Sequence, residues 1–213
     1  MNLYFDIGGT NFRYYIFSYN NKKLIKSASY KRTNNVLQQL YNFIKNLYLF
    51  YKFDVIKVAI PGYVQNNYIY GVNNAGIPDG TQLFTNFNNI SIEYFNDGDA
   101  FIMGELVSNN IKKIKNNILG IIFGTGVGSG LIINGKLVIN SEIFLFLEDF
   151  MKNNYLSNEN IDYVTTFLSQ EFLKLIYLLN LDFIIINGYV NNFENFSNLI
   201  LKKTILKSNY NTK

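Results

Sequence analysis

The chain has 213 residues, of which 48% are hydrophobic and 17% aromatic, so it can bury a substantial core in one or two compact units. Its net charge of +4 comes mainly from dispersed lysines rather than from a basic face with interleaved aromatics, so we expect no nucleic-acid partner. Cysteine and histidine are absent, which excludes disulfides, zinc sites built from either residue, and Ser-His or Cys-His nucleophiles.

The first half of the sequence predicts a strand-rich unit with two helices. Apolar residues at helical spacing, beginning at Val36, indicate the first helix, and Pro61-Gly62 ends a buried strand. Asn96 or Asp97 marks the start of the second helix. The expected order is strands at 2–7, 12–18 and about 24–31, a helix within 35–52, a strand at 54–60, a polar loop, a strand at 90–95 and a helix within 96–107.

The second half repeats this pattern from Asn117. We therefore expect two similar βββαβ-type halves, 1–108 and 109–213, each opening with a strand, a glycine-rich turn and a strand. The expected elements of the second half are strands at 117–123, 128–134 and 136–140, helices at about 142–153 and 160–179, a strand at 182–188 and a helix at 192–206.

Membrane and export signals are not expected. Asp6 interrupts the apolar N-terminus, so we expect no signal peptide. The longest apolar stretch, 118–133, has 16 residues with five glycines and falls short of a membrane span. We expect a soluble, cytoplasmic protein without a membrane partner. The excess of Asn, Lys, Ile, Tyr and Phe is attributed to codon bias, which weakens arguments from individual Asn or Lys residues.

The segment DIGGTNFR, 6–13, joins two predicted strands through more than a simple hairpin needs. Gly8 and Gly9 allow backbone N–H groups to converge on an anion, and Thr10 adds a hydroxyl. Asp6 would hold Mg²⁺ through water, because Mg²⁺ keeps much of its hydration shell. The alternative is an ordinary Gly-Gly hairpin beside a chance Asp. The pattern favours a turn built around a phosphate and a metal ion.

A second glycine-rich segment, FGTGVGSG, spans 123–130. Its four glycines exceed what a hairpin needs, since each weakens a strand, and with Thr125 they fit a second phosphate-binding turn. The dinucleotide pattern fails, because Ser129 stands where the third glycine belongs. Residues 130–137 nearly match the P-loop but end in leucine where a hydroxyl must reach the metal. Asn134-Gly135 instead predicts a type I′ hairpin turn.

The third motif is NDGDAFIMGE, 96–105, which places Asn96 and Asp97 at a helix start. An acidic residue there commonly caps the helix or complements its dipole. Taken alone, this segment favours that structural interpretation. The order of the motifs along the chain adds a functional one.

That order is D-x-G-G-T-N-x-R, P-G, N-D-x-x-A-x-x-x-G-E, then G-T-G-x-G-x-G followed by I-N-G-K-L. From residue 2 to about 140 it resembles the ROK family of sugar kinases and repressors, and equally the bacterial glucokinases, within the actin-like, hexokinase-like ATPase superfamily. The resemblance implies an α/β, actin-like (ribonuclease H-like) ATPase fold with its two halves around a cleft. It also implies ATP and Mg²⁺ as cofactors and phosphoryl transfer to a hexose.

The resemblance also implies a role for particular residues. Asp6 would orient Mg²⁺, and Asp97 would be the base that receives the proton of the sugar hydroxyl. Asn187-Gly188 stands where the family has a glycine pair beside the adenosine. The implied ATP-binding residues are Gly8, Gly9, Thr10, Gly124, Thr125, Gly126 and Gly188, and the implied sugar-binding residues are Gly62, Asn74, Asn96 and Asp97.

The chain also departs from the family pattern. The family usually carries Glu-x-Gly-His, whose Glu and His hold the sugar, followed by a Cys/His zinc site. This chain has neither motif, so we expect no zinc, and Glu142 and Glu148 are the glutamates near the missing position. The chain also ends early, and its first phosphate motif begins at residue 2, which disfavours the repressor branch with its DNA-binding domain.

We therefore expect a glucokinase-like sugar kinase whose partners are a small sugar and ATP. The alternative is a non-catalytic nucleotide- or sugar-binding protein that kept the phosphate turns and lost the acceptor site. The sequence leaves the oligomeric state open, with a homodimer among the alternatives.

Overall fold

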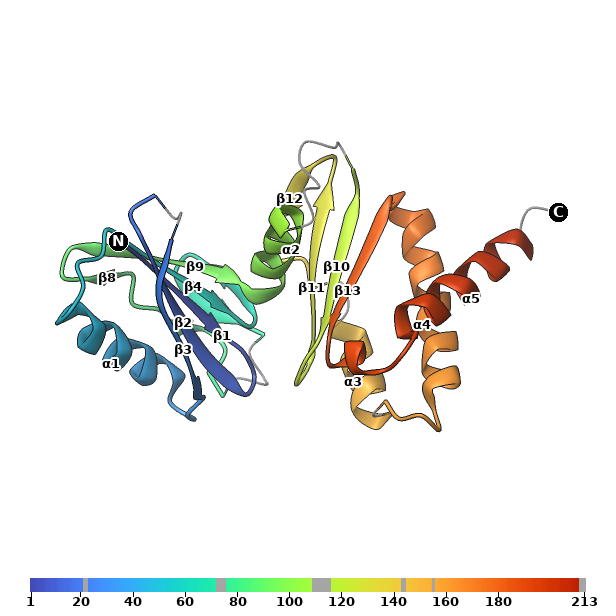
Figure 1. Ribbon diagram of the computed structural model, residues 1–213, viewed down its shortest axis with the longest axis horizontal. Coiled ribbons are helices and arrows are strands. Elements are labelled where there is room, and N and C mark those ends of the chain that lie inside the picture. The colour runs from blue at the N-terminus through green and yellow to red at the C-terminus, as the bar shows by residue number, and fades with distance from the viewer. Residues whose placement is uncertain (21–22, 72–75, 109–115, 143–144, 155, 211–213) are drawn as a thin grey trace. The chain divides into compact units, whose positions relative to one another are not determined.

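The computed structural model describes residues 1–20, 23–71, 76–108, 116–142, 145–154 and 156–210. The chain divides into two compact units, Met1–Ala100 and Phe101–Lys213 (Figure 1). The division falls inside helix α2 (Asp97–Ser108), whose first turn belongs to the first unit.

The first unit is built on a six-stranded mixed sheet with the order β3-β2-β1-β4-β9-β8. Strands β1 and β2 form an antiparallel hairpin that continues into β3, whereas β1, β4 and β9 run parallel. The carboxyl ends of these three parallel strands therefore lie at one edge of the sheet. The strands are β1 (Asn2–Ile7), β2 (Asn11–Phe17), β3 (Leu24–Lys31), β4 (Val55–Ile60), β8 (Asn86–Phe87) and β9 (Ile90–Asn96).

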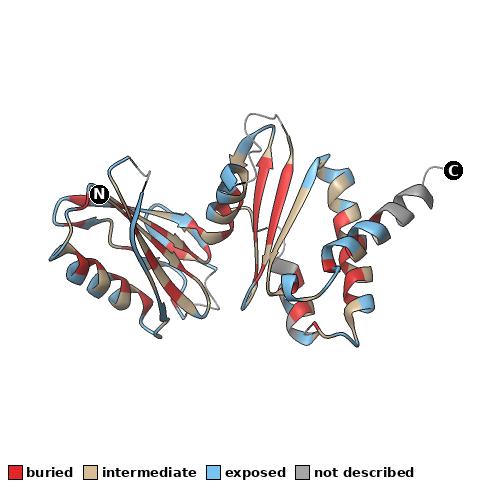
Figure 2. Cartoon of the chain, in the orientation of Figure 1, coloured by how far each residue is buried: buried red, intermediate tan, exposed pale blue. Residues whose placement is uncertain are grey.

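Helix α1 (Val36–Tyr48) covers one face of this sheet (Figure 1). Its buried residues recur at helical spacing, and the Asn35 side chain accepts a hydrogen bond from the backbone N–H of Gln38 as an N-cap. Alternate residues of β1, such as Leu3 and Phe5, are buried against it, which follows from the two-residue repeat of a strand. Figure 2 shows this contrast between buried and exposed sides.

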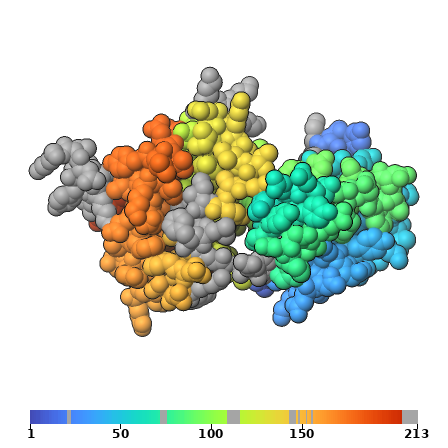
Figure 3. Space-filling view, turned by 180° about the vertical axis from the view of Figure 1, so that it is seen from behind, coloured from blue at the N-terminus to red at the C-terminus, as the bar shows by residue number. Residues whose placement is uncertain are grey.

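The prediction of a polar loop between the strands at 54–60 and 90–95 is wrong in detail, because the described part of this segment contains short strands. Strands β5 (Tyr63–Gln65), β6 (Tyr68–Tyr70) and β7 (Thr81–Gln82) make a small antiparallel sheet. It lies at the surface of the first unit, in teal in Figure 3, and buries Ile69 in that unit's core. Asn66 and Asn67 both have positive φ and form the tight turn of its first hairpin.

The second unit repeats the topology with a four-stranded sheet, β12-β11-β10-β13. Again a hairpin leads into a third antiparallel strand, and β10 and β13 run parallel. This confirms the predicted fold of two βββαβ-type halves. The elements are β10 (Ile118–Phe123), β11 (Val127–Ile133), β12 (Lys136–Val138), α3 (Leu145–Asn153), α4 (Ile161–Leu179), β13 (Phe183–Gly188), the short 3-10 helix η1 (Tyr189–Asn192) and α5 (Phe196–Tyr210).

Helices cover both faces of this second sheet. Residues of α3, α4 and α5 share one core with Leu119, Ile121 and Phe123, whereas Ile102 of α2 packs with Ile118 on the other face. Burial on both faces explains the almost continuous apolar sequence of β10 and β11, which are mostly red in Figure 2.

Asn134 and Gly135 have φ of 52° and 74°, which confirms the type I′ turn between β11 and β12. In the part of the chain that the structure describes, no helix combines the length and the apolar character needed to cross a bilayer.

Burial of Tyr94 leads to a prediction about alkaline stability. Its hydroxyl donates to the carbonyl oxygen of Phe84 at 2.9 Å, and burial raises the Tyr94 pKa well above its usual value. Because the pKa of Tyr94 is higher in the folded state than in the unfolded state, the neutral hydroxyl contributes to stability. This contribution is complete below the ordinary tyrosine pKa of about 10 and is lost as the pH rises above it. We expect Tyr94→Phe to reduce this alkaline loss, measured as the free energy of unfolding between pH 8 and 11.5. Tyr19→Phe, at an exposed position, is the control and should leave the loss unchanged.

Candidate active site

The predicted residues of the first unit gather at the carboxyl edge of its parallel strands. In the sheet register Asp6 pairs with Ala59, and Ala59 pairs with Phe95. Asp6 and Phe95 therefore lie two strand spacings apart, about 10 Å, and Asp97 follows two residues later. Because parallel strands end at the same edge, the first glycine turn, Gly62 and Asp97 are brought to one end of one sheet.

The first turn is the three-residue loop Gly8-Gly9-Thr10 between β1 and β2. Its first N–H is used internally, since the Gly8 N–H donates to the Asn11 carbonyl oxygen at 2.9 Å. Among the described residues, the N–H of Gly9 has no hydrogen-bond acceptor, and Thr10 is exposed. An anion at this turn would therefore meet the Gly9 amide and the Thr10 hydroxyl rather than the Gly8 amide.

Asp6 has a partner that the sequence analysis did not foresee. Arg13, opposite Asp6 in the β1–β2 register, donates from Nη1 to Asp6 Oδ2 at 2.9 Å, and both side chains are about two-fifths exposed. An ion pair this exposed contributes about 0–1 kcal/mol, so a competing cation can displace it at small cost. Both residues lie on the sheet face opposite α1, because their strand neighbours point into the α1 core.

Asn96 is the residue that connects the acceptor-side segments. It is 1% exposed, its Nδ2 donates to the Gly62 carbonyl oxygen at 2.7 Å, and its Oδ1 accepts from the Asp99 N–H at 3.0 Å. The second bond is an N-cap on α2. Asn96 thus ties the end of β4 to the start of α2 and fixes the position of Asp97, the first residue of that helix.

The second turn, Gly124-Thr125-Gly126, occupies the corresponding place in the second unit but has a different internal hydrogen bond. It is again a three-residue loop between antiparallel strands, and the Gly124 N–H donates to the Gly126 carbonyl oxygen at 2.9 Å. Thr125 is exposed, as Thr10 is in the first turn. The two halves therefore present short turns of glycine and threonine at equivalent places in their topology.

Packing within the chain does not require the leading glycine of either turn. A Cβ built on Gly8 would lie 3.7 Å from Asn11 O, and one on Gly124 would lie 4.0 Å from Gly126 O, both ordinary contacts. Neither glycine has φ in the left-handed region. Among the described residues nothing would block a side chain at either glycine, so the backbone there is accessible to a ligand such as a phosphate group.

Gly188 behaves differently, since the fold itself requires a glycine there. Its φ is 105° and its ψ −156°, and a Cβ would lie 2.0 Å from the carbonyl oxygen of Phe123, its partner in the parallel β10–β13 pair. Phe123 directly precedes the second turn. The neighbouring Asn187 accepts from the Gly188 N–H at 2.7 Å and donates to Glu105 Oε1 at 3.3 Å, so its side chain supports this strand end.

Three sequence candidates remain. Asn74 lies outside the described residues, and so does the side chain of Glu148, whose backbone is in α3. Glu142 is partly buried just before that helix. The structure adds Arg32, which no motif identified because its contact with Gly9 joins residues 23 positions apart. It also joins two residues of separate motifs, Asn187 and Glu105.

The donor set suits a magnesium ion that arrives with its nucleotide. Within the described residues, no group of three or more Asp, Glu, His or Cys side chains could enclose a metal. Mg²⁺ is commonly held by one or two carboxylates together with substrate phosphates and water, so Asp6 beside an open glycine turn fits such an ion.

Comparison with known sequences finds one family match. Residues 3–144 match the sequence profile described as the ROK family. No curated protein sequence matches the chain significantly.

Solved structures resemble most of the chain at low sequence identity. A ROK family protein from Streptococcus pneumoniae TIGR4, in complex with sucrose, has TM-score 0.75 and 17% identity over 96% of this chain and 86% of its own. The inorganic polyphosphate/ATP-glucomannokinase from Arthrobacter sp. strain KM has TM-score 0.69 and 22% identity, over 89% of this chain and 84% of its own. A ROK family transcriptional regulator, a homologue of the E. coli MLC protein, has TM-score 0.70 and 13% identity, over 95% of this chain and 69% of its own. These likenesses establish the actin-like ATPase fold.

Proposed function

This chain belongs to the ROK family, and on that premise we propose that it is an ATP-dependent kinase that phosphorylates a hexose hydroxyl, as glucokinases do. The observation that carries the proposal is the shared sheet edge in the first unit. Asp6, the open Gly8-Gly9-Thr10 turn and Asp97 lie there together, within about two strand spacings. Phosphoryl transfer depends mainly on positioning and charge stabilisation, which such an edge can supply.

The proposed mechanism gives each segment one task. The Gly9 amide and Thr10 hydroxyl bind phosphate oxygens of ATP. The turn Gly124-Thr125-Gly126 is the proposed phosphate-binding turn of the second unit. Asp6 would hold Mg²⁺ beside the first turn. Bound Mg²⁺ would neutralise charge that develops on the phosphate oxygens. Gly188, beside the second turn, would border the adenosine.

Asp97 acts on the acceptor. Its carboxylate takes the proton of the sugar hydroxyl while the hydroxyl oxygen forms a bond to the γ-phosphorus, and the bond from that phosphorus to the β,γ-bridging oxygen breaks to release ADP. Asn96 positions Asp97 by capping α2 and holding Gly62. Because both polar ends of Asn96 are engaged in this way, we assign it a positioning role in addition to the predicted contact with the sugar.

A second candidate function is nucleotide or sugar binding without catalysis. It is supported by the absence of the Glu-x-Gly-His motif, and by a transcriptional regulator among the structures that share the fold. Under this alternative the phosphate turns still bind ATP, but no acceptor is phosphorylated.

The experiment is an assay of ADP formation from Mg-ATP over a panel of hexoses and amino-hexoses. We expect turnover with several epimers at low affinity, because few polar side chains are available to reject a wrong hydroxyl. Strict preference for one epimer would show that Glu142, Glu148 or a partner chain completes the sugar site. Mg²⁺-dependent ATP binding without turnover on any sugar would favour the binding-protein alternative.

A further inference from the structure

The two arginines of the sequence both contact the first glycine turn or its Asp. Arginine accounts for two of 19 basic residues, the rest being lysine, in a composition that favours lysine. Arg13 pairs with Asp6, and Arg32 contacts Gly9. Placement of both at one turn indicates a requirement for the planar guanidinium, which binds oxyanions through a fork of N–H groups as lysine cannot.

Arg32 reaches the turn from the end of β3. Its backbone N–H donates to the Thr10 carbonyl oxygen at 2.9 Å, and its Nε donates to the Gly9 carbonyl oxygen at 2.8 Å. Arg32 is half-buried, so its guanidinium is partly desolvated beside the turn. Arg13 pairs with Asp6, and the Arg32 guanidinium lies against the backbone of Gly9.

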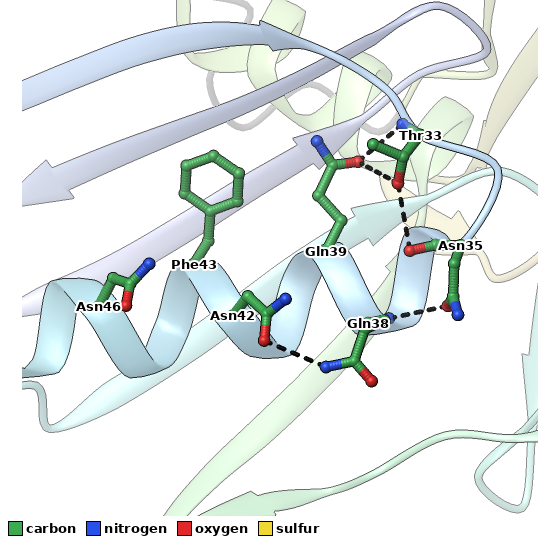
Figure 4. A pocket seen from close by; sticks show the side chains of 7 residues that line it. All are labelled: Thr33, Asn35, Gln38, Gln39, Asn42, Phe43 and Asn46. Carbon is green, nitrogen blue, oxygen red and sulfur yellow. Dashed lines mark hydrogen bonds between the residues drawn. The ribbon is translucent and has the colours of Figure 1, made fainter.

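Helix α1 holds the segment on either side of Arg32. Gln39 donates from Nε2 to the Lys31 carbonyl oxygen at 3.0 Å, and its Oε1 accepts from the Thr33 N–H at 2.9 Å. Figure 4 shows Gln39 reaching from α1 to Thr33 at the rim of a hollow of about 270 Å³. These two hydrogen bonds hold the residues on both sides of Arg32 and so fix its backbone. A fixed backbone helps to preorganise a charged side chain for a ligand.

We propose that Arg32 is a phosphate-binding residue of the first turn and that Gln39 is the positioning residue that holds it there. The ligand is the phosphate chain of a nucleotide, so the inference rests on the proposed function for the identity of the ligand. It does not require catalysis, because a nucleotide-binding protein would use the same charge.

The test is calorimetric titration of the full chain with Mg-ATP, Mg-ADP and adenosine. Arg32→Gln should lose about 10- to 100-fold in affinity for ATP and ADP, the worth of a charge-assisted hydrogen bond, and should bind adenosine as the unaltered protein does. Lys31→Gln, at the exposed neighbouring position, also removes one positive charge and should leave the affinities for ATP, ADP and adenosine unchanged. Equal ATP affinities for the two variants would overturn the proposal.

Two further variants separate a ligand contact from a structural bond. Arg32→Lys keeps the positive charge but lacks the planar fork of N–H groups. Its affinity for ATP should lie between those of the unaltered protein and Arg32→Gln. Gln39→Leu keeps the Arg32 residue but removes the two hydrogen bonds that hold its neighbours. It should weaken ATP binding several-fold and leave adenosine binding unchanged. Parallel loss of ATP and adenosine in both Arg32→Gln and Gln39→Leu would mean that Arg32 only supports the fold, and the proposal would fail.

This test can fail independently of the kinase proposal. If the chain binds ATP through Arg32 but phosphorylates no sugar, the kinase proposal fails and the inference stands. If it phosphorylates a sugar and Arg32→Gln binds ATP normally, the inference alone fails. Absence of Mg²⁺-dependent nucleotide binding by the unaltered chain would overturn both.

Discussion

Replacing Asp97 by Asn is expected to lower the rate of sugar phosphorylation by about 10²- to 10⁴-fold, the usual loss when a general base is removed. Asn keeps the shape of the side chain and its bond to the Gly98 N–H while removing the charge and the basicity. The start of α2 is a favourable place for a negative charge, because the helix dipole is positive there. The measurement is kcat and KM for the sugar together with Kd for Mg-ATP.

The nucleotide affinity of Asp97→Asn should stay within a factor of about two, since the phosphate turns and Asp6 lie on other segments. Glu93→Gln is the matched control, because it removes one carboxylate from an exposed position on β9. It should leave kcat unchanged. Equal turnover by Asp97→Asn and the unaltered protein would show that another group accepts the proton.

The second large effect is expected for Gly188→Ala, which should destabilise the second unit by about 2–6 kcal/mol. The φ and ψ of Gly188 lie in a region that is almost exclusive to glycine, and the added methyl group would meet the backbone of Phe123 at 2.0 Å. Backbone cannot move aside as a flexible side chain can. The end of β13 must then separate from β10 next to the second turn, so ATP affinity should fall as well.

Gly104→Ala is the control for this variant. Gly104 lies in α2, and a Cβ there would have no neighbour within 4 Å, so the substitution should stabilise by up to about 1 kcal/mol through helix propensity. Chemical denaturation followed by circular dichroism measures both changes. A Gly188→Ala protein as stable as the Gly104→Ala protein would contradict the close β10–β13 contact.

Most of the fold could be predicted because strand alternation and helical spacing are local signals. The first strand, the helix from Val36 and the strand near 183–188 all follow from such patterns. The small sheet β5–β7 was missed because Asn was discounted as a product of codon bias. In the described residues every non-glycine with positive φ is an asparagine, and Asn66-Asn67 and Asn88-Asn89 make turns between strands.

The candidate site could be predicted only as far as its motifs reach. Motifs identified the two glycine turns, Asp6 and Asp97, but not what holds them. The Asp6–Arg13 pair depends on register, and the Arg32 contact to Gly9 joins residues 23 positions apart. The Asn96 bond to Gly62 spans 34 positions. Such contacts arise from the topology of the sheet, which one sequence pattern does not encode.

The most direct test of the central claim is to follow the γ-phosphoryl group itself by ³¹P NMR. The unaltered chain would be incubated with Mg-ATP and a mixture of hexoses, alongside Asp97→Asn. Phosphoryl transfer to the sugar predicts a sugar-phosphate resonance that grows as ADP appears, and its near absence with the Asp97→Asn protein. ATP that is bound in the presence of Mg²⁺ but remains intact, or that yields only inorganic phosphate, would contradict the assignment of this chain as a sugar kinase.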